Sequence, residues 1–495
     1  MQLQPLLDRL RQTDLLTEVQ LPAGAAADTI TIDHLADDSR EVGPEGCFVA
    51  VRGTSTDGHS FIDKAVQNGA IAIVCEAVPG KAKARFPGTA FVRVSDSRRA
   101  LSELAAAYYG DPARELRMIG VTGTNGKTTT ATLVHHLLTI VGDTPGLIGT
   151  IEIRMGDRAV DTSLTTPGPL DVHRQLRDMV DAGCTSCAME VSSHALDQDR
   201  VASIDYDVAI FTNLTADHLD YHGTLVAYRN AKKKLFDGLA ADATACYNAD
   251  DPAGPQVVAD TAAPRLSYGT GAGADIRVEV LESRLDGLRL RLDGRTGSFR
   301  LVGRFNAYNL AAAYAAGCAL GYDPADVVQA LEVAPPVAGR FEQIVFDDGT
   351  TVIVDYAHTP DALENVLQSI RSLKPDSAAL WCVFGCGGDR DPSKRRMMGS
   401  IAERYADRVI VTSDNPRTEE PEAVMNDIRR GMNRPTDAQW LVDRDDAIHA
   451  AAEQARPGDV VLIAGKGHET YQVIGTEKRP FDDREKARQY FADRE

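Results

Sequence analysis

The chain has 495 residues, 43% hydrophobic and 25% charged, which is more than one hydrophobic core usually supports, so we expect about two to four domains. The formal net charge of −19 argues against a nucleic-acid backbone or an anionic membrane as partner, because both would be repelled. The start, MQLQPLLDRLRQTD, lacks a signal-peptide pattern, and no apolar run approaches the roughly 20 residues of a membrane span. We therefore expect a cytoplasmic protein without a membrane partner.

The first segment alternates apolar runs at 47–51, 70–76 and 90–96 with polar or helical stretches. Such runs are typical of buried strands, and the apolar-periodic stretch that begins at residue 100 predicts a helix. A proline-containing linker near 111–117 follows. This pattern predicts an N-terminal α/β domain over residues 1–113.

The second segment opens with the predicted strand RMIGVTG and the predicted helix KTTTATLVHHLLTIVG, which begins at residue 127. Further strands are expected at 185–191 and 207–213, and an alanine-rich helix is expected at 306–321. The linker LEVAPPVAGR then ends the segment. We expect this central domain to span residues 114–336.

Between that strand and helix, GVTGTNGKTTTA resembles a phosphate-binding P-loop but has Val121 where the pattern G-x-x-x-x-G-K-[ST] asks for glycine. Backbone N–H groups and the positive end of a helix meet at such a turn, which favours phosphate oxygens. Lys127 is predicted to lie along the β/γ-phosphates, and Thr128 offers a hydroxyl to Mg²⁺. An ordinary strand-to-helix loop is the alternative interpretation.

Two strand ends in this segment carry groups suited to a metal. Glu190 ends an apolar strand, where a carboxylate is costly to bury unless it meets a cation. His218 follows another apolar strand, although a histidine in such a loop is more often simply solvated. The lysine run in NAKKKLF is by composition a solvated helix face, so composition selects none of its lysines.

Cysteine pairs offer a different metal hypothesis. Cys184 and Cys187, together with Cys382 and Cys386, have spacings that zinc sites use. Each pair lies in an apolar strand-like run, and buried small hydrophobic side chains are the better interpretation. Eight cysteines in a chain of this length are also too few for a disulfide framework.

The third segment repeats one theme at 350–357, 380–385, 407–414 and 459–465, where an apolar run ends in a polar or glycine-rich turn. This spacing predicts a parallel sheet with helices on both faces. Ligands of such sheets bind at the carboxyl ends of the strands, so the polar clusters that follow the four runs should converge on one crevice. A dinucleotide-binding fold is an alternative, but GCGGDRD does not complete G-x-G-x-x-G because Arg390 occupies the third position.

Eight segments in one order resemble the ATP-dependent Mur ligases of peptidoglycan synthesis. They are GTNGKTT, EVSSHAL, TNLTADHLDYHG, GRFNAYNLAAA, DYAHTPDAL, GCGGDRD, DNPR and GKGHE. The resemblance continues into the first segment through DDSREVGPEGCFVAVRG. It implies an α/β fold of three domains: a central P-loop ATPase-type parallel sheet, a C-terminal Rossmann-like domain at 337–495 and a smaller N-terminal α/β domain.

The resemblance also implies an activity. It suggests an amide ligase that uses ATP and Mg²⁺ to add meso-diaminopimelate to UDP-N-acetylmuramoyl-L-alanyl-D-glutamate through an acyl phosphate, acting as a monomer. Addition of L-lysine or another diamino acid is the nearest alternative. More distant alternatives are a folylpolyglutamate synthase, a P-loop regulatory ATPase and a non-catalytic binding module.

Site residues follow from the resemblance, position by position. The implied ATP contacts are Gly123, Thr124, Asn125, Gly126, Lys127, Thr128, Thr129, Asn309, Arg340, Asp355 and His358. The implied Mg²⁺ ligands are Thr128, Glu190, His218 and Lys232, the last as a carbamylated lysine, and with Lys127 in place of Thr128 they are also the implied catalytic set. The implied contacts of the UDP-linked substrate are Ser39, Thr165, Thr166, Ser193, Gln198 and Arg200. Where the family has asparagine before the Thr-Thr pair, this chain has Leu164.

The implied site of the incoming amino acid comprises Arg390, Asp414, Asn415, Pro416, Arg417, Gly465 and Glu469. Diaminopimelate carries two carboxylates and two amino groups. The guanidinium forks of Arg390 and Arg417 suit the carboxylates, and Asp414 and Glu469 suit the ammonium groups. Lysine has no distal carboxylate, so Arg417 would be a buried charge without a partner in a lysine-adding enzyme. Surface salt bridges are the alternative interpretation of these four residues.

Overall fold

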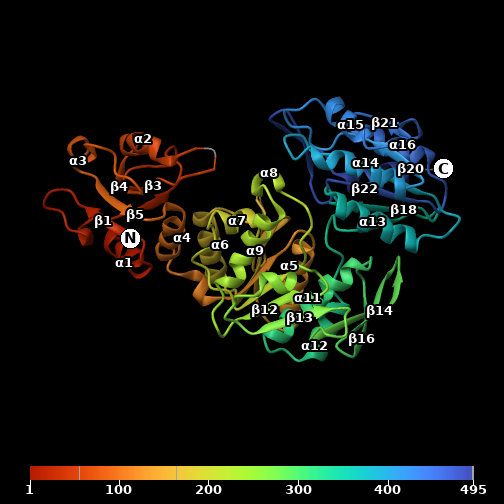
Figure 1. Cartoon of the computed structure of the whole chain (residues 1–495), viewed down its shortest axis with the longest axis horizontal. Helices are drawn as coiled ribbons and strands as arrows, with labels where there is room; N and C mark the ends of the chain where they lie inside the picture. Colours follow the sequence, from red (N-terminus) through yellow and green to blue (C-terminus); the bar gives the residue numbers. More distant parts are fainter. Residues whose placement is uncertain (55, 163, 493–495) are drawn as a thin grey trace.

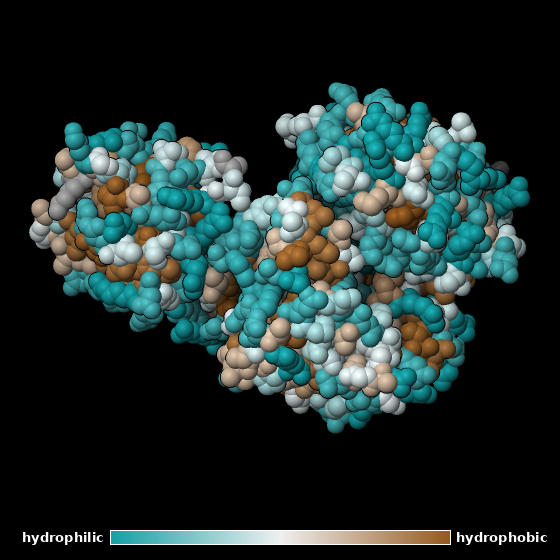
Figure 2. All heavy atoms as spheres, viewed as in Figure 1, coloured by the Kyte–Doolittle hydropathy of each residue, from teal (hydrophilic) through white to brown (hydrophobic). Residues whose placement is uncertain are grey.

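A computed structural model describes residues 1–54, 56–162 and 164–492 of the chain. Three lobes follow one another in chain order, and the central lobe lies between the two outer ones (Figure 1). The space-filling view shows a largely hydrophilic face with a broad notch between the N-terminal and C-terminal lobes (Figure 2). Among the described residues, no helix combines the length and the apolar character that crossing a membrane requires.

The N-terminal lobe is one sheet with the strand order β1-β5-β4-β3-β2 and helices around it. Its elements are α1 Leu3–Gln12, β1 Leu16–Gln20, β2 His34–Ala36, β3 Gly46–Val49, α2 Ile62–Gln67, β4 Ala70–Cys75, α3 Ala82–Arg85, β5 Ala90–Val94 and α4 Ser97–Tyr108. The three apolar runs at 47–51, 70–76 and 90–96 form strands β3, β4 and β5, which confirms the prediction. Helix α1 buries leucines at 3, 6, 7 and 10, the spacing of one helix face, so the sheet gains an apolar cover.

The central lobe is built on a long sheet with the order β16-β15-β14-β13-β12-β11-β6-β10-β7-β8-β9. Its strands are β6 Arg117–Thr122, β7 Pro145–Ile148, β8 Glu152–Met155, β9 Arg158–Asp161, β10 Ser186–Glu190, β11 Val208–Phe211, β12 Thr244–Asn248, β13 Arg265–Gly269, β14 Ile276–Arg284, β15 Gly287–Leu292 and β16 Arg295–Phe299. Its helices are α5 Lys127–Ile140, α6 Pro169–Asp181, α7 Ser193–Asp197, α8 Leu219–His222, α9 Leu225–Asp237, α10 Gly254–Val257, α11 Phe305–Ala319 and α12 Pro324–Glu332. Strand β6 lies between β10 and β11 and pairs in parallel with both, so three predicted strand ends meet at one edge.

The C-terminal lobe has the strand order β17-β18-β22-β19-β20-β21. Its strands are β17 Glu342–Val345, β18 Thr351–Asp355, β19 Leu380–Phe384, β20 Arg408–Val411, β21 Gln439–Trp440 and β22 Val460–Ala464, with a separate hairpin of β23 Tyr471–Ile474 and β24 Glu477–Pro480. Its helices are α13 Pro360–Leu373, α14 Ser393–Tyr405, α15 Pro421–Arg429, α16 Arg444–Gln454 and α17 Asp483–Ala492. The four predicted runs form the parallel strands β18, β19, β20 and β22, as expected.

Antiparallel hairpins extend the central sheet where no strands were predicted. Strands β14, β15 and β16 pair in sequence, and their turns contain Asp286-Gly287 and Asp293-Gly294. Asp293 and Gly294 have φ of 44° and 80°, values that favour Asp-Gly in a tight hairpin turn. These dipeptides between alternating apolar residues were a usable signal for the hairpins.

Candidate functional site

The phosphate-binding loop occupies the turn between β6 and α5. Val121 lies inside β6, so the missing glycine of the P-loop pattern belongs to the strand and not to the loop. Gly123 has φ of 150°, and a Cβ on it would overlap the Thr212 hydroxyl. Gly126 has φ of 87° and precedes the first residue of α5, where a Cβ would overlap the Asn309 amide. A side chain at either position would therefore be sterically excluded, which explains why both residues are glycine.

Thr124 and Asn125 join the loop to its neighbours. The Thr124 backbone N–H donates to the Asn213 carbonyl oxygen at 2.8 Å, and the Thr124 hydroxyl donates to the Thr215 carbonyl oxygen at 3.2 Å. The Asn125 side chain donates to Asp361 Oδ2 at 2.8 Å, which connects the loop to helix α13 of the C-terminal lobe. Hydrogen bonds from both the central and the C-terminal lobe thus hold the loop in place.

Glu190 is buried at the end of β10, beside the loop. Its Oε2 accepts a hydrogen bond from the Thr128 hydroxyl at 3.0 Å and another from the Thr150 hydroxyl at 3.1 Å. Its Oε1 accepts from the Thr150 backbone N–H at 2.6 Å. Arg340 Nη2 donates to the Thr128 hydroxyl at 3.0 Å. The carboxylate and the hydroxyl that were predicted as metal ligands therefore lie in direct contact.

Lys127 and Lys232 point to the same carbonyl oxygen. Lys127 Nζ lies 3.0 Å and Lys232 Nζ lies 2.7 Å from the oxygen of Gly123. Burial, together with the charge of Lys127, lowers the pKa of Lys232 well below its usual value. Lys233, the next residue, instead pairs with Asp260 at 2.7 Å on the outer side of α9. The tertiary structure thus distinguishes Lys232, which is buried at the phosphate loop, from the other lysines of the run, a distinction that composition could not make.

His218 directly precedes α8 and has φ of 53°, and its Nε2 lies 3.4 Å from Asp217 Oδ2. Burial and the positive charge of Lys127 lower the pKa of His218 to about 4, although Asp217 opposes them, so the imidazole is neutral at pH 7. Across residues 1–54, 56–162 and 164–492, no group of three or more His, Cys, Asp or Glu side chains is placed to hold a metal ion. The hard oxygen donors of Thr128 and Glu190 nevertheless suit Mg²⁺, and Lys232 supplies an oxygen donor only if it is carbamylated.

One cavity of about 880 Å³ between the central and C-terminal lobes brings the predicted clusters together. All four polar clusters that follow β18, β19, β20 and β22 contribute to its wall, as the strand-end argument predicted. The predicted site residues that line it are Lys127, Thr165, Thr166, Ser193, Arg200, His218, Lys232, His358, Arg390, Asp414, Asn415, Arg417, Gly465 and Glu469. The phosphate loop and the predicted amino-acid site thus share one space.

Arg390 and Arg417 converge on Gly387 at the C-terminal wall of this cavity. A Cβ built on Gly387 would lie 2.9 Å from Arg417 Nη1 and 3.7 Å from Arg390 Cγ. Arg417 has φ of 53°, its N–H donates to the Val473 carbonyl oxygen at 3.1 Å, and its Nη1 donates to the Gly388 carbonyl oxygen at 2.7 Å. Hairpin β23–β24 therefore positions the arginine through the backbone.

On the acidic side, Glu469 already has a cationic partner. Lys466 Nζ is buried and lies 2.9 Å from Glu469 Oε2, which also accepts from the Asn415 side chain at 2.8 Å. Asp414 Oδ1 accepts from the Asn415 N–H at 2.6 Å. Sequence analysis gave Lys466 no role, although it follows β22 within a predicted cluster. Pro416 is buried in the same loop, next to Arg417.

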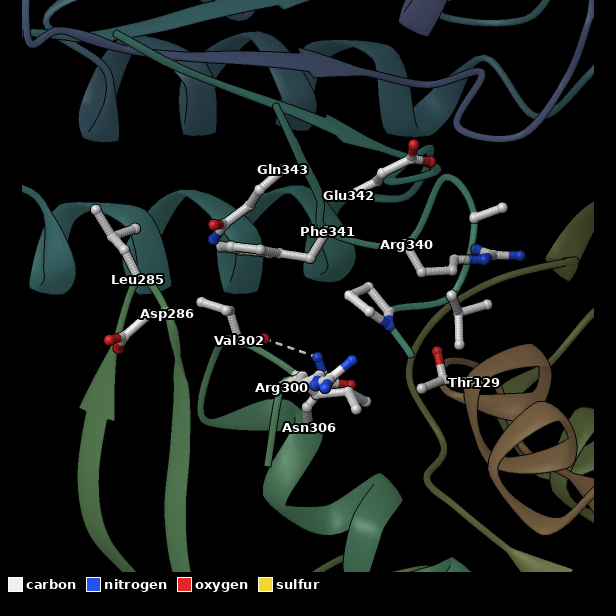
Figure 3. A pocket seen from close by; sticks show the side chains of 14 residues that line it. Thr129, Leu285, Asp286, Arg300, Val302, Asn306, Arg340, Phe341, Glu342 and Gln343 are labelled. Carbon is white, nitrogen blue, oxygen red and sulfur yellow. Dashed lines mark hydrogen bonds between the residues drawn. The ribbon is translucent and has the colours of Figure 1, made fainter. Parts of the chain in front are cut away.

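A second cavity, of about 540 Å³, borders the first turn of helix α5 at Thr129 (Figure 3). Thr129 and Arg340, two predicted ATP contacts, line it together with Asn306, whose side chain donates to the Val302 carbonyl oxygen at 2.7 Å. Leu285 and Asp286 of the unpredicted β14–β15 hairpin close one side. Helix α5 thus borders both cavities at its first turn, through Lys127 and Thr129.

Asp355 and Asn309, two further predicted ATP contacts, make hydrogen bonds within the protein. Asp355 is buried and accepts from the backbone N–H groups of Phe341 and Ala357, both at 2.7 Å, so it holds the residue next to Arg340. Asn309 Nδ2 donates to Asn306 Oδ1 at 2.8 Å. Asp355 is thus held beside the linker between the lobes, whereas the bond of Asn309 lies within helix α11.

The residues predicted to contact the UDP-linked substrate are spread over two lobes. Gln198 donates to the Tyr221 hydroxyl at 3.1 Å and accepts from Arg200 Nη2 at 2.8 Å. Ser39 lies in the N-terminal lobe, outside the residues that line either cavity. Leu164 is 49% exposed and lines the larger cavity, so this chain presents an apolar group at that point of the wall.

Thr150 was missed by sequence analysis, although a signal for it existed. It follows β7, the strand next to β10, and a strand-end argument applied to that strand would have included it.

The cysteine pairs behave as expected. Cys184, Cys187, Cys382 and Cys386 are all buried, as predicted for small hydrophobic side chains.

Family models match most of the chain. The Mur ligase family catalytic domain matches residues 31–109, the Mur ligase middle domain matches 121–317, and the Mur ligase glutamate ligase domain matches 339–467. Each match falls within one of the three predicted domains. The boundaries at 113/114 and 336/337 stay predictions.

Curated and solved relatives agree with these matches. UDP-N-acetylmuramoyl-L-alanyl-D-glutamate--2,6-diaminopimelate ligase of Parabacteroides distasonis is 46% identical over 97% of this chain and 98% of its own length. A solved structure with the same name is 34% identical and has a TM-score of 0.67, covering 95% of this chain and 97% of its own. Folylpolyglutamate synthase of Mycobacterium tuberculosis, at 20% identity and a TM-score of 0.61, covers 74% of this chain, a likeness of fold alone.

Proposed function

The chain belongs to the Mur ligase family, and we propose that it joins a diamino acid, meso-diaminopimelate, to UDP-N-acetylmuramoyl-L-alanyl-D-glutamate with ATP as energy source. The observation that carries the proposal is the cavity of about 880 Å³, whose wall includes both Lys127 of the phosphate loop and the arginine pair Arg390 and Arg417. A ligase needs the activated carboxylate and the incoming amine in one space. A regulatory ATPase does not need such an arrangement.

Amide formation from a carboxylate requires activation, and phosphoryl transfer from ATP supplies it as an acyl phosphate. Lys127, at the positive end of α5, is proposed to neutralise charge on the transferring phosphoryl group. The amine of the incoming amino acid then attacks the acyl carbon, the new amide bond forms, and inorganic phosphate leaves with the carbon–oxygen bond electrons. The overall products are the amide, ADP and phosphate.

The nucleotide is proposed to span both sides of the first turn of α5. Its terminal phosphates lie at Lys127 in the larger cavity, and its nucleoside lies in the smaller cavity beside Thr129 and Arg340. The loop glycines and the helix N-terminus between them offer backbone N–H groups to phosphate oxygens. Only the terminal phosphates then occupy the larger cavity, and the rest of its volume is available to the other two substrates.

Thr128, Glu190, His218 and Lys232 are proposed to hold Mg²⁺. When bound, Mg²⁺ supplies charge neutralisation for the phosphoryl oxygens. The lowered pKa of Lys232 supports its predicted carbamylation, because a neutral amine, unlike an ammonium, can attack carbon dioxide. The lowered pKa of His218 keeps its imidazole neutral at pH 7, with a lone pair to donate.

Selection of the amino acid is assigned to the C-terminal wall. Arg390 and Arg417 are proposed to bind carboxylates of diaminopimelate, and Asp414 and Glu469 to bind its ammonium groups. Because Glu469 already pairs with Lys466, Asp414 is expected to carry more of the ammonium binding. Action as a monomer in the cytoplasm is part of the same proposal.

The test is phosphate release from ATP with UDP-N-acetylmuramoyl-L-alanyl-D-glutamate present and one amino acid added at a time. Release that depends on meso-diaminopimelate and exceeds release with L-lysine is the expected result. Equal or greater release with L-lysine would replace the proposal by its nearest alternative. Release that is indifferent to both the amino acid and the UDP-linked substrate would favour a regulatory ATPase.

A further inference from the structure

A fully buried ion pair lies behind the C-terminal wall of the larger cavity, outside the residues that line it. Arg444 begins α16 and Asp483 begins α17, and both side chains are 0% exposed. Arg444 Nε donates to Asp483 Oδ1 and Arg444 Nη2 donates to Asp483 Oδ2, each at 2.7 Å. Two desolvated charges are costly to keep, so a bidentate pair in this position invites a functional explanation.

The same guanidinium reaches two strand ends. Arg444 Nη2 lies 3.0 Å from the carbonyl oxygen of Ala464, the last residue of β22. Arg444 Nη1 lies 3.4 Å from the carbonyl oxygen of Ser413, which follows β20. Strands β22 and β20 are not neighbours, because β19 lies between them in the sheet. Arg444 therefore connects two strand ends that no ladder hydrogen bond joins.

The residues that follow these two carbonyl groups are Asp414 and Gly465, and both line the larger cavity. They face each other closely, since a Cβ on Gly465 would overlap Asp414 Oδ2. Burial alone would lower the pKa of Arg444, but the carboxylates of Asp483, Asp414 and Glu469 outweigh it and hold the pKa above its usual value. The buried guanidinium thus interacts with the acidic groups of the cavity wall in two ways: it hydrogen-bonds the residues next to Asp414 and Gly465, and its charge attracts the carboxylates of Asp414 and Glu469.

We propose that Arg444 and Asp483 are positioning residues for the amino-acid site: they hold the carboxylate of Asp414 against Gly465 at the spacing that receives an ammonium group of the diamino acid. The inference rests on the proposed function of this wall. Asp483 orients the guanidinium, and the guanidinium fixes the two strand ends. Substrate ammonium then meets a carboxylate that does not have to move.

A purely structural role, joining α16 to α17, is already filled by a neighbouring pair. Lys486 Nζ lies 2.9 Å from Asp445 Oδ1 on the same two helices, and the Tyr490 hydroxyl donates to Asp445 Oδ2 at 2.8 Å. That pair is partly exposed, and in the part of the chain that the structure describes neither side chain bonds to β20 or β22. It is therefore a matched control for the buried pair.

The experiment compares apolar replacements of the two pairs. In the double variant Arg444→Met/Asp483→Leu, side chains of similar volume replace both charges, a change that is often neutral for stability. We expect its KM for meso-diaminopimelate to rise by at least about tenfold, because loss of positioning at a reacting site costs up to about 100-fold. The KM values for ATP and for the UDP-linked substrate should stay within about twofold of wild type. The control Asp445→Asn/Lys486→Met should leave all three KM values unchanged.

A second variant guards against loss of folding in the double variant. Arg444→Lys keeps a positive charge beside Asp483 but removes the planar fork that reaches the carbonyl oxygens of Ala464 and Ser413, and it should raise the same KM by about threefold or more. Wild-type enzyme is measured first, and if it releases no phosphate in response to diaminopimelate, the proposed function is refuted and this inference with it. If wild type responds, and a folded variant of the buried pair keeps the wild-type KM for diaminopimelate, the inference alone is overturned.

Discussion

Replacement of Arg417 by lysine tests whether a guanidinium fork selects the amino acid. Arg417 uses Nη1 to bond the Gly388 carbonyl oxygen at 2.7 Å, and the side chain lines the larger cavity. A guanidinium has five N–H donors in a plane, so it can keep that bond and still offer donors to a carboxylate. A lysine ammonium has three donors at a single point. The backbone φ of 53° costs the same for both residues, so the change acts on the side chain alone.

The size of the effect follows from the bond that is lost. One hydrogen bond to a charged group contributes about 1.5–3 kcal/mol. Because about 1.4 kcal/mol is a factor of ten, Arg417→Lys should raise the KM for meso-diaminopimelate by about 10- to 150-fold. Use of L-lysine, which has no distal carboxylate, should not become weaker. The KM for ATP should also stay close to wild type, because Arg417 lies outside the residues that line the nucleoside cavity.

The assay is initial-rate phosphate release at saturating ATP and UDP-linked dipeptide, with diaminopimelate varied. Arg479→Lys is the matched control: Arg479 lies on β24, pairs with Glu477 at 3.0 Å and is 57% exposed, so its replacement should change no KM value. An Arg417→Lys enzyme with the wild-type KM for diaminopimelate would refute the assigned role. A general rise in all KM values would instead indicate a disturbed loop.

Three further outcomes are expected. Lys232→Ala should abolish ligation because it removes the buried amine at Gly123, whereas Lys233→Ala should retain it, and equal ligation rates in the two variants would contradict the assignment. Gly465→Ala, with φ of 118° and a Cβ that overlaps Asp414, should cost about 1–3 kcal/mol of strain and raise the KM for diaminopimelate, measured beside its thermal unfolding. Burial lowers the pKa of His173 from 6.5 to about 4, so on acidification the unfolded chain binds a proton before the folded chain does. The free energy of unfolding should therefore fall as the pH drops from 6.5 toward 4, by about 2 kcal/mol at pH 5. Urea unfolding of His173→Gln should show a smaller loss over that range, and an equal loss would show that His173 is not responsible.

Much of the fold followed from local patterns. Apolar runs that end in polar turns located β18, β19, β20 and β22, since a strand buried on both faces must be apolar along its length. The same local logic placed the phosphate loop between β6 and α5 and put Glu190 at a strand end. It failed at the β14–β16 hairpins, whose alternating residues carry a weaker signal than a continuous apolar run.

The sequence by itself determined the chemical groups available and their positions at strand ends, because both depend on neighbours along the chain. Only the tertiary structure decided which groups meet, because that depends on strand order: β10 and β11 lie on either side of β6, and β19 separates β22 from β20. Lys232 differs from Lys233 only in the direction in which helix α9 presents it. Arg444 and Asp483, 39 positions apart, gain a shared role only when two helices bury them behind one wall.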